Sequence, residues 1–480
     1  MTADKRWTLG VVCAATFMLL LDVTIVVVAL PDIQARLHTS LGEVQWVTDA
    51  YALTPAALLL TSGALADRYG RKRLFVCGLV VFTLGSALCA AAQSPLMLVL
   101  SRAAQGVGGA ALFATSLALL ASTFHGRERG VVFGVWGAVA GMSTALGPVL
   151  GGLITSGISW RGVFWVNLPV GVAALLVTWQ YVEESRAPHA HRPDWAGFAT
   201  LTLCLVALVY GLIRASEEGW GDGVVVTCFV AAAVLLAVFV AIERRVANPM
   251  FDLGLLRIPT FLGGSVAAFA MNGSLFAMLL YLTLFLQSDL GYSAVQTGVR
   301  LLLMSGVTMV LATIAGRLSS GRSVRWLIGT GLVVVGVALL TMSGLDAGSD
   351  WTHLIVGLLL GGVGAGLVNA PLASTAVGVV HHHQAGMASG ANTTFRQIGI
   401  AVGIAAYGSI FAAALRGHAA LGPRAAYAHA LNELLVVSGC VAIVGGLLAL
   451  VLIRPRDFAA VHAEPVTEPA AETATETVDA

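Results

Sequence analysis

Long apolar stretches separated by short polar segments dominate the pattern of this chain. A helix needs roughly 20 apolar residues to cross the hydrocarbon core of a bilayer. In the first half such runs lie near residues 8–30, 46–65, 74–93, 96–121, 131–156, 163–182 and 196–214. In the second half they lie near residues 224–242, 261–287, 299–315, 326–345, 353–373, 397–416 and 431–452. The pattern therefore predicts an all-α membrane protein with about fourteen transmembrane helices.

The first apolar run follows Lys5 and Arg6, as the core of a signal peptide would. It is longer than such a core, however, and no small-residue cleavage site separates it from the polar segment Asp32–Arg36. We therefore expect a retained transmembrane helix.

The composition agrees with a chain that is surrounded largely by lipid. Hydrophobic residues make up 58% of the chain, charged residues 11%, and the mean hydropathy is +0.87. Soluble domains carry about a quarter charged residues, because water must cover their surface. The net charge of +1 gives no basic excess for binding nucleic acid, so no nucleic-acid partner is expected.

The distribution of positive charge predicts the orientation. Most of the 26 lysines and arginines fall in segments that share one side of the membrane if the number of spans is even. The positive-inside rule then places both termini in the cytoplasm of a cell (inner) membrane protein. The tail from about Asp457 is predicted to be disordered, because its glutamates repeat every four residues and Pro465 and Pro469 interrupt any helix.

Three ionisable residues lie well inside the apolar runs: Asp22, Asp49 and Arg102. Asp22 is about eight residues, or roughly 12 Å, from the external end of its run, and Asp49 about five residues, or roughly 8 Å. Adjacent antiparallel helices would place both carboxylates within about one turn of the same depth. Because charges are costly inside a membrane, each is a candidate proton site. A purely structural ion pair between Asp22 and Arg102 is the alternative.

No enzyme motif accompanies these residues. The chain has neither a GxxxxGK phosphate loop nor a GxSxG nucleophile, so we expect a protein that is not an enzyme and needs no cofactor. The six cysteines lie in apolar runs without CxxC spacing, which favours small buried side chains over disulfides or metal ligands. The run His381–His383 lies in a polar segment and is interpreted as a solvated loop, so no metal site is expected.

Gly147 and Pro148, followed by Gly151 and Gly152, interrupt an apolar run with helix-weakening residues. A proline removes one helical hydrogen bond, and clustered glycines leave a smooth, bendable face. Ordinary close packing of two helices is an equally good interpretation from the chemistry alone.

Five segments of the chain resemble the signature motifs of one transporter family. They are Leu21–Pro31, Trp46–Leu53, Gly63–Arg73, Arg102–Gly109 and Gly147–Gly152, and the match extends to Trp160, Arg161, Phe164, Asn167, Pro169, Arg396 and Gln397. Together these segments resemble the major facilitator superfamily and, within it, the fourteen-helix drug–proton antiporters, over roughly residues 10 to 455. Val27 stands where that family usually has Asn.

The resemblance implies roles for these motifs. A cytoplasmic gating latch between two six-helix halves would comprise Gly63, Asp67, Arg68, Gly70, Arg71 and Arg73. Arg102 would tune the protonation of Asp22, the proton-coupling role being left open between Asp22 and Asp49. The antiporter motif, which shapes the cavity and prevents leak, would comprise Gly147, Pro148, Gly151 and Gly152.

The resemblance also implies a division of the chain. Residues 1–182 would form the N-terminal six-helix bundle and residues 261–456 the C-terminal one, with the tail at 457–480. Residues 183–260 would hold two extra helices and a cytoplasmic connector between the bundles. The connector, Glu243–Thr260, mixes apolar and charged residues, which is typical of a segment lying on the membrane surface.

The function expected from the sequence is proton-coupled efflux of hydrophobic or cationic drugs or antibiotics, by antiport and alternating access. The proton gradient would drive it, a small molecule and the lipid bilayer would be its partners, and a monomer is the expected state. The alternatives are a dedicated exporter of a single endogenous metabolite, a proton symporter for uptake, and a membrane sensor that transports nothing.

Overall fold

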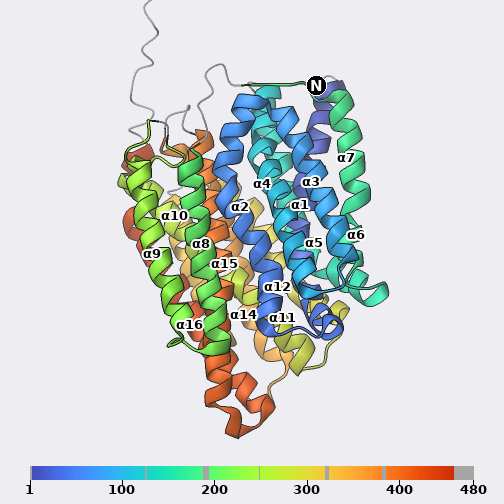
Figure 1. Cartoon of the computed structure of the whole chain (residues 1–480), viewed down its shortest axis with the longest axis vertical. Coiled ribbons are helices and arrows are strands. Elements are labelled where there is room, and N and C mark those ends of the chain that lie inside the picture. The colour runs from blue at the N-terminus through green and yellow to red at the C-terminus, as the bar shows by residue number, and fades with distance from the viewer. Residues whose placement is uncertain are drawn as a thin grey trace, which may run out of the picture.

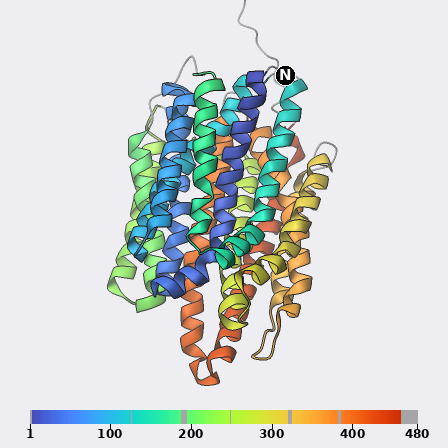
Figure 2. The same ribbon diagram turned by 90° about the vertical axis from the view of Figure 1, so that its right-hand side faces the viewer.

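The computed structural model describes residues 3–124, 127–186, 194–247, 249–318, 324–380 and 385–458. Within these ranges the regular secondary structure is helical throughout, with no β-strand. The long helices lie side by side along the long axis of the molecule (Figures 1 and 2). The predicted disordered tail and the run His381–His383 lie outside the described residues, apart from Asp457 and Phe458.

The first helices form one half of the molecule and the last helices the other. The N-terminal half contains α1 (Ala3–Leu37), α2 (Leu41–Tyr69), α3 (Arg71–Ala91), α4 (Pro95–Thr123), α5 (Arg127–Gly157), α6 (Gly162–Trp165) and α7 (Asn167–Tyr181). An inserted pair follows, α8 (Trp195–Glu218) and α9 (Gly223–Glu243). The C-terminal half contains η1 (Leu253–Arg257), α10 (Pro259–Met271), η2 (Asn272–Phe276), α11 (Ala277–Leu284), η3 (Phe285–Asp289), α12 (Ala294–Leu318), α13 (Val324–Met342), η4 (Trp351–Leu354), α14 (Ile355–Gly378), α15 (Ala385–Gly417), η6 (Ala419–Leu421) and α16 (Pro423–Leu452).

Twelve helices of the described chain are long and apolar enough to cross a membrane, and the bent helix α5 makes thirteen. Helix α2 is 29 residues long but less apolar, because it carries Asp49 and several hydroxyl groups. With α2 the number fits the fourteen predicted spans. The chain is therefore a multi-pass membrane protein, and Figure 1 shows that α16 ends at the same end of the molecule at which α1 begins.

Local sequence signals fix where the helices begin and end. Ser40 and Glu43 form a capping box at the start of α2. Gly70, with a φ of 118°, separates α2 from α3, since few side chains tolerate that conformation. Asp222 caps α9, and the nearby Arg214 guanidinium holds the pKa of the Asp222 carboxyl below its usual range.

The span from Pro259 to Asp289 is one continuous crossing with two π-helical segments, η2 and η3. Such segments insert an extra residue into a helix and shift the direction of its side chains. At η2 the backbone approaches α15 closely, and a Cβ on Gly403 would come within 2.6 Å of the Gly273 carbonyl oxygen. This crossing and α1 are the most buried spans, whereas α9 is mostly exposed and faces the surroundings of the protein.

The two halves meet mainly through α2 with α15 and α5 with α12, and α1 also contacts α11 and α12. Helix α8 packs on both α2 and α15, so the inserted pair lies against the junction of the halves, and α9 lies outside α8 (Figure 1).

Part of the connector is buried against protein, and its place on the membrane surface stays a prediction. Its residues Met250, Phe251 and Leu255 are buried in a cluster with side chains of α8, α10 and α15. Apolar residues that alternate with charged ones can contact either lipid or protein. Here the packing of the inserted helices determines that these three side chains contact protein.

Candidate functional site

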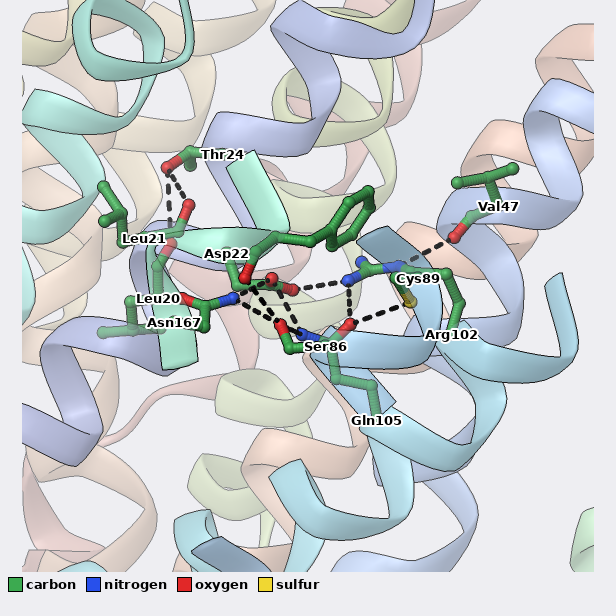
Figure 3. A network of polar contacts seen from close by, with 11 residues as sticks. Leu20, Leu21, Asp22, Thr24, Val47, Ser86, Cys89, Arg102, Gln105 and Asn167 are labelled. Atoms are coloured by element: carbon green, nitrogen blue, oxygen red, sulfur yellow. Dashed lines mark hydrogen bonds and ion pairs between the residues drawn. The ribbon is translucent and has the colours of Figure 1, made fainter. Parts of the chain in front are cut away.

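A buried ion pair lies inside the N-terminal half, as Figure 3 shows. Arg102 of α4 donates to the Asp22 carboxylate of α1, with an Nη1–Oδ2 distance of 2.5 Å. Both side chains are essentially inaccessible to solvent. Two charges in such a place remain ionised only if each is paired and hydrogen-bonded.

Amide and hydroxyl groups complete the surroundings of Asp22. Its Oδ1 accepts hydrogen bonds from Gln105 and Asn167, both at 2.9 Å. Both amides also donate to the Ser86 hydroxyl, at 3.0 and 2.9 Å. These residues come from α3, α4 and α7, so the network joins four helices of one half around a single carboxylate (Figure 3).

Arg102 is held on its other side by α2. Its Nε donates to the Val47 carbonyl oxygen at 3.1 Å, and its guanidinium lies over the Tyr51 ring, 4.1 Å from the centroid. A cation over an aromatic face is stabilised by the electrons of the ring. The position of Arg102 therefore depends on α2 as well as on α1.

Asp49 lies in a different environment from Asp22. Its side chain is fully buried, and neither carboxylate oxygen has a hydrogen-bond partner among the described residues. Gln45, one turn earlier on α2, donates to the Tyr281 hydroxyl at 3.1 Å, so this face of α2 meets the C-terminal half. An ionised carboxylate without a partner is strongly disfavoured there, so a neutral, protonated Asp49 fits this site.

The two carboxylates lie at a similar depth but are not joined. Arg102 reaches the carbonyl of Val47, two residues before Asp49, which places the Asp22 network level with this part of α2. Asp22 faces the interior of the N-terminal half, and Asp49 lies on the helix that contacts α15.

A small cavity of about 30 Å³ lies between the two halves. Its lining comes from α1, α5, η2, α11, α12 and α14, and none of the lining side chains is ionisable: Thr24, Val27, Val28, Pro148, Leu275, Phe276, Leu279, Leu301, Met304, Ser305, Thr308 and Ala365. Thr24 is two residues from Asp22, so α1 carries the buried ion pair on one side and lines the cavity on another.

The Gly147–Gly152 segment packs against both halves. A Cβ on Gly151 would come within 2.7 Å of the Ile25 carbonyl oxygen in α1, and one on Gly152 within 2.5 Å of the Ala294 carbonyl oxygen in α12. Pro148 itself lines the cavity, and its carbonyl oxygen faces Gly298. The glycines therefore allow α5 to approach α1 and α12 closely, which supports the packing interpretation.

The described contacts of the Gly63–Arg73 motif lie within the N-terminal half. Arg71 pairs with Asp67 at 2.9 Å, and the Arg73 guanidinium lies 3.8 Å from Glu184, just after α7. Glu184 also accepts the backbone N–H groups of Lys72 and Arg73 at the start of α3. Arg68 lies over Tyr69, and a Cβ on Gly63 would meet open space. A role as a latch between the halves stays a prediction.

Other candidate chemistry is sparse in the part of the chain that is described. It contains no group of three or more His, Cys, Asp or Glu side chains placed to bind a metal ion. All six cysteines are free, and Cys89 contacts Gln105 at the edge of the Asp22 network.

Two helical halves, a cavity between them and buried charges beside it define a membrane transporter. A family model for the Major Facilitator Superfamily matches residues 12–404. The chain belongs to this superfamily.

Relatives and solved structures agree with this assignment. The chain is 36% identical to "Multidrug resistance protein Stp" of Mycobacterium tuberculosis over 94% of its own length and 85% of the relative. It is 39% identical to "Puromycin resistance protein pur8" of Streptomyces alboniger over 84% of its length and 80% of the relative. Among solved structures, a bacterial homologue of the human lysosomal transporter Spinster has a TM-score of 0.67 at 15% identity, covering 95% of this chain and 99% of that one. That likeness shows the fold.

Sequence reasoning gave no role to Ser86, Gln105 or Asn167, although they complete the site of Asp22. The signal that could have found them is their polarity inside apolar runs. That signal is weak, because a hydroxyl or amide in a membrane helix often bonds to its own backbone.

Proposed function

We propose that this protein exports hydrophobic or cationic drugs or antibiotics from the cytoplasm by proton antiport. The proposal depends on two buried carboxylates near an apolar cavity that differ in their partners. Asp22 forms an ion pair with Arg102, whereas Asp49 has no hydrogen-bond partner among the described residues. The printed names of the relatives, which include multidrug resistance and antibiotic resistance proteins, support export of such compounds. The cavity lining favours hydrophobic substrates, because it offers no counter-ion to a charged one.

The proposed cycle uses the difference between the two carboxylates. In this cycle Asp49 carries the proton while it is buried, and Asp22 remains paired with Arg102. When the halves rock apart, Asp49 meets water and exchanges its proton, and α2 moves with it. Because α2 also holds Arg102 through Val47 and Tyr51, this movement is transmitted to the Asp22 pair and to α1, which lines the cavity.

Everted membrane vesicles, acidified inside, test the proposal with a panel of hydrophobic and cationic fluorescent compounds. Wild type should accumulate substrate when the gradient is imposed and release protons from the lumen. Asp49→Asn should lose this accumulation yet still exchange labelled for unlabelled substrate, because the amide mimics the protonated acid. Asp32→Asn is the matched control, since Asp32 pairs with Arg36 near the end of α1 and should keep wild-type transport.

The outcomes also separate the alternatives. Full gradient-driven accumulation by Asp49→Asn would contradict a coupling role for Asp49 and transfer it to Asp22. Movement of substrate out of these vesicles together with protons would indicate an uptake symporter. Accumulation of a single compound of the panel would indicate a dedicated exporter. No flux of any compound would overturn drug export.

A further inference from the structure

Two buried carboxylates meet where the inserted pair of helices ends. Asp194 immediately precedes α8, and Glu243 is the last residue of α9, so the antiparallel pair brings them to the same end. Their exposed fractions are only 9% and 5%. Neither residue belongs to the Asp22 network, the cavity lining or the Gly63–Arg73 motif.

One oxygen of each carboxylate accepts a described hydrogen bond, and the other oxygen accepts none. Asp194 Oδ1 accepts the Gly197 N–H at 2.8 Å, and Glu243 Oε2 accepts the Phe251 N–H at 3.1 Å. Asp194 Oδ2 and Glu243 Oε1 are buried and have no hydrogen-bond partner among the residues that the structure describes. Both of these oxygens lie within 2.7 Å of the point where a Cβ on Gly197 would stand, so both are directed at the same small space beside that glycine.

No described cation neutralises this pair. Arg244 and Arg245 follow Glu243 but are exposed. Among the charged groups of the adjoining elements, Asp67 of α2 pairs with Arg71 of α3, Arg396 of α15 contacts Asn369 of α14, and Asp252 accepts the Gly254 N–H. Arg68 of α2 and Arg257 of the connector are exposed. None of these forms a described ion pair with Asp194 or Glu243.

We propose that Asp194 and Glu243 share one proton, and that this protonated pair is a pH-sensitive clasp holding the inserted helices to the connector. Two ionised carboxylates at this separation would repel each other and each would lose hydration. A single proton, taken from solvent at this end of the molecule, lets one carboxyl donate to the other. It also gives both unpartnered oxygens a hydrogen bond.

The clasp controls a segment that touches both halves of the transporter. Next to the Phe251 N–H, the Phe251 ring packs between Phe261 of α10 and Phe395 of α15, with centroid distances of 6.5 and 6.3 Å. Met250 accepts a hydrogen bond from Thr61 of α2 at 3.3 Å. Loss of the proton therefore loosens a contact between α9 and the junction of the halves.

Infrared spectroscopy of the full-length protein in nanodiscs, without substrate, tests the shared proton. At about pH 7 wild type should show a protonated-carboxyl band that Glu243→Gln and Asp194→Asn each reduce. Glu218→Gln, an exposed carboxylate at the other end of α8, is the matched control and should leave the band unchanged. Asp49→Asn should remove a separate component, so a failure of the antiport proposal is distinguishable from a failure of this one.

Thermal unfolding between about pH 5 and about pH 8 provides the second readout. The folded state binds a proton that the unfolded carboxyls have released at these pH values. Wild-type stability should therefore fall as pH rises, by on the order of 1 °C per pH unit. Glu243→Gln and Asp194→Asn should flatten this slope, and Glu218→Gln should not.

An unchanged band and slope in both variants would overturn the proposal, as would a Glu243→Gln protein less stable than wild type at high pH. A slope that disappears only on adding a metal cation would instead indicate a cation site.

Discussion

At the scale of single residues, the environment rather than the residue type separates Asp22 from Asp49. Both are aspartates inside apolar helices, and the sequence does not indicate which of them couples proton movement to transport. Asp22 receives a guanidinium and two amide donors, whereas Asp49 receives none from the described residues. Because a buried charge needs such partners, the same side chain is suited to staying ionised at one position and to carrying a proton at the other.

This difference predicts that the same substitution lowers stability far more at Asp22 than at Asp49. Asp22→Asn leaves Arg102 buried without its counter-ion, and should lower the free energy of unfolding by about 3–5 kcal/mol. Asp49→Asn replaces a neutral group by one of the same shape and should cost less than about 1 kcal/mol. Unfolding of the purified variants in detergent at neutral pH measures both. Equal losses in the two variants would contradict the assignment, and Asp22→Asn combined with Arg102→Met should recover most of the loss.

At the scale of helices, close backbone approach at glycine determines how α5 meets its neighbours. Gly151 faces α1 of its own half, and Gly152 faces α12 of the other. The sequence placed a special segment here and left bending and packing equally open. The contacts favour packing, because in a membrane small residues bring helices together where apolar side chains gain nothing over lipid.

A side chain at position 152 should therefore prevent α5 and α12 from packing closely and so hinder contact between the two halves. Gly152→Val should separate α5 from α12 and reduce gradient-driven transport at least tenfold, with protein levels in the membrane retained. Gly157→Val is the matched control, because a Cβ there meets open space five residues further along the same helix. Vesicle transport normalised to protein level measures the effect. Equal activity of the two variants would show that this contact does not matter for the cycle.

At the scale of the whole molecule, the inserted pair provides a test of orientation. The turn between α8 and α9 and the residues after α9 lie at opposite ends of one membrane helix. The distribution of lysine and arginine predicts that the turn is external and that the residues after α9 are cytoplasmic.

Single cysteines in a background without the six native ones should report these sides. A membrane-impermeant maleimide should label Gly221→Cys in intact cells and Arg245→Cys only after the cells are opened, since both positions are exposed. The opposite labelling pattern would reverse the orientation and with it the proposed direction of export. Labelling of both in intact cells would indicate that one of the two helices does not cross the membrane.

The sequence by itself determined the helices, since run length and polarity follow directly from the hydrocarbon thickness. Each predicted span corresponds to a helical crossing, although α15 begins at Ala385, earlier than the run at 397–416, because polar residues such as Asn392, Thr393 and Arg396 lower the hydropathy of its first part. The sequence also marked Asp22, Asp49 and Arg102 as costly in a membrane. Only the tertiary structure decided which of them are partnered, that Met250, Phe251 and Leu255 of the connector are buried, and that Asp194 lies near Glu243. These depend on contacts between helices far apart in the chain, which hydropathy cannot encode because it sums over neighbours in sequence.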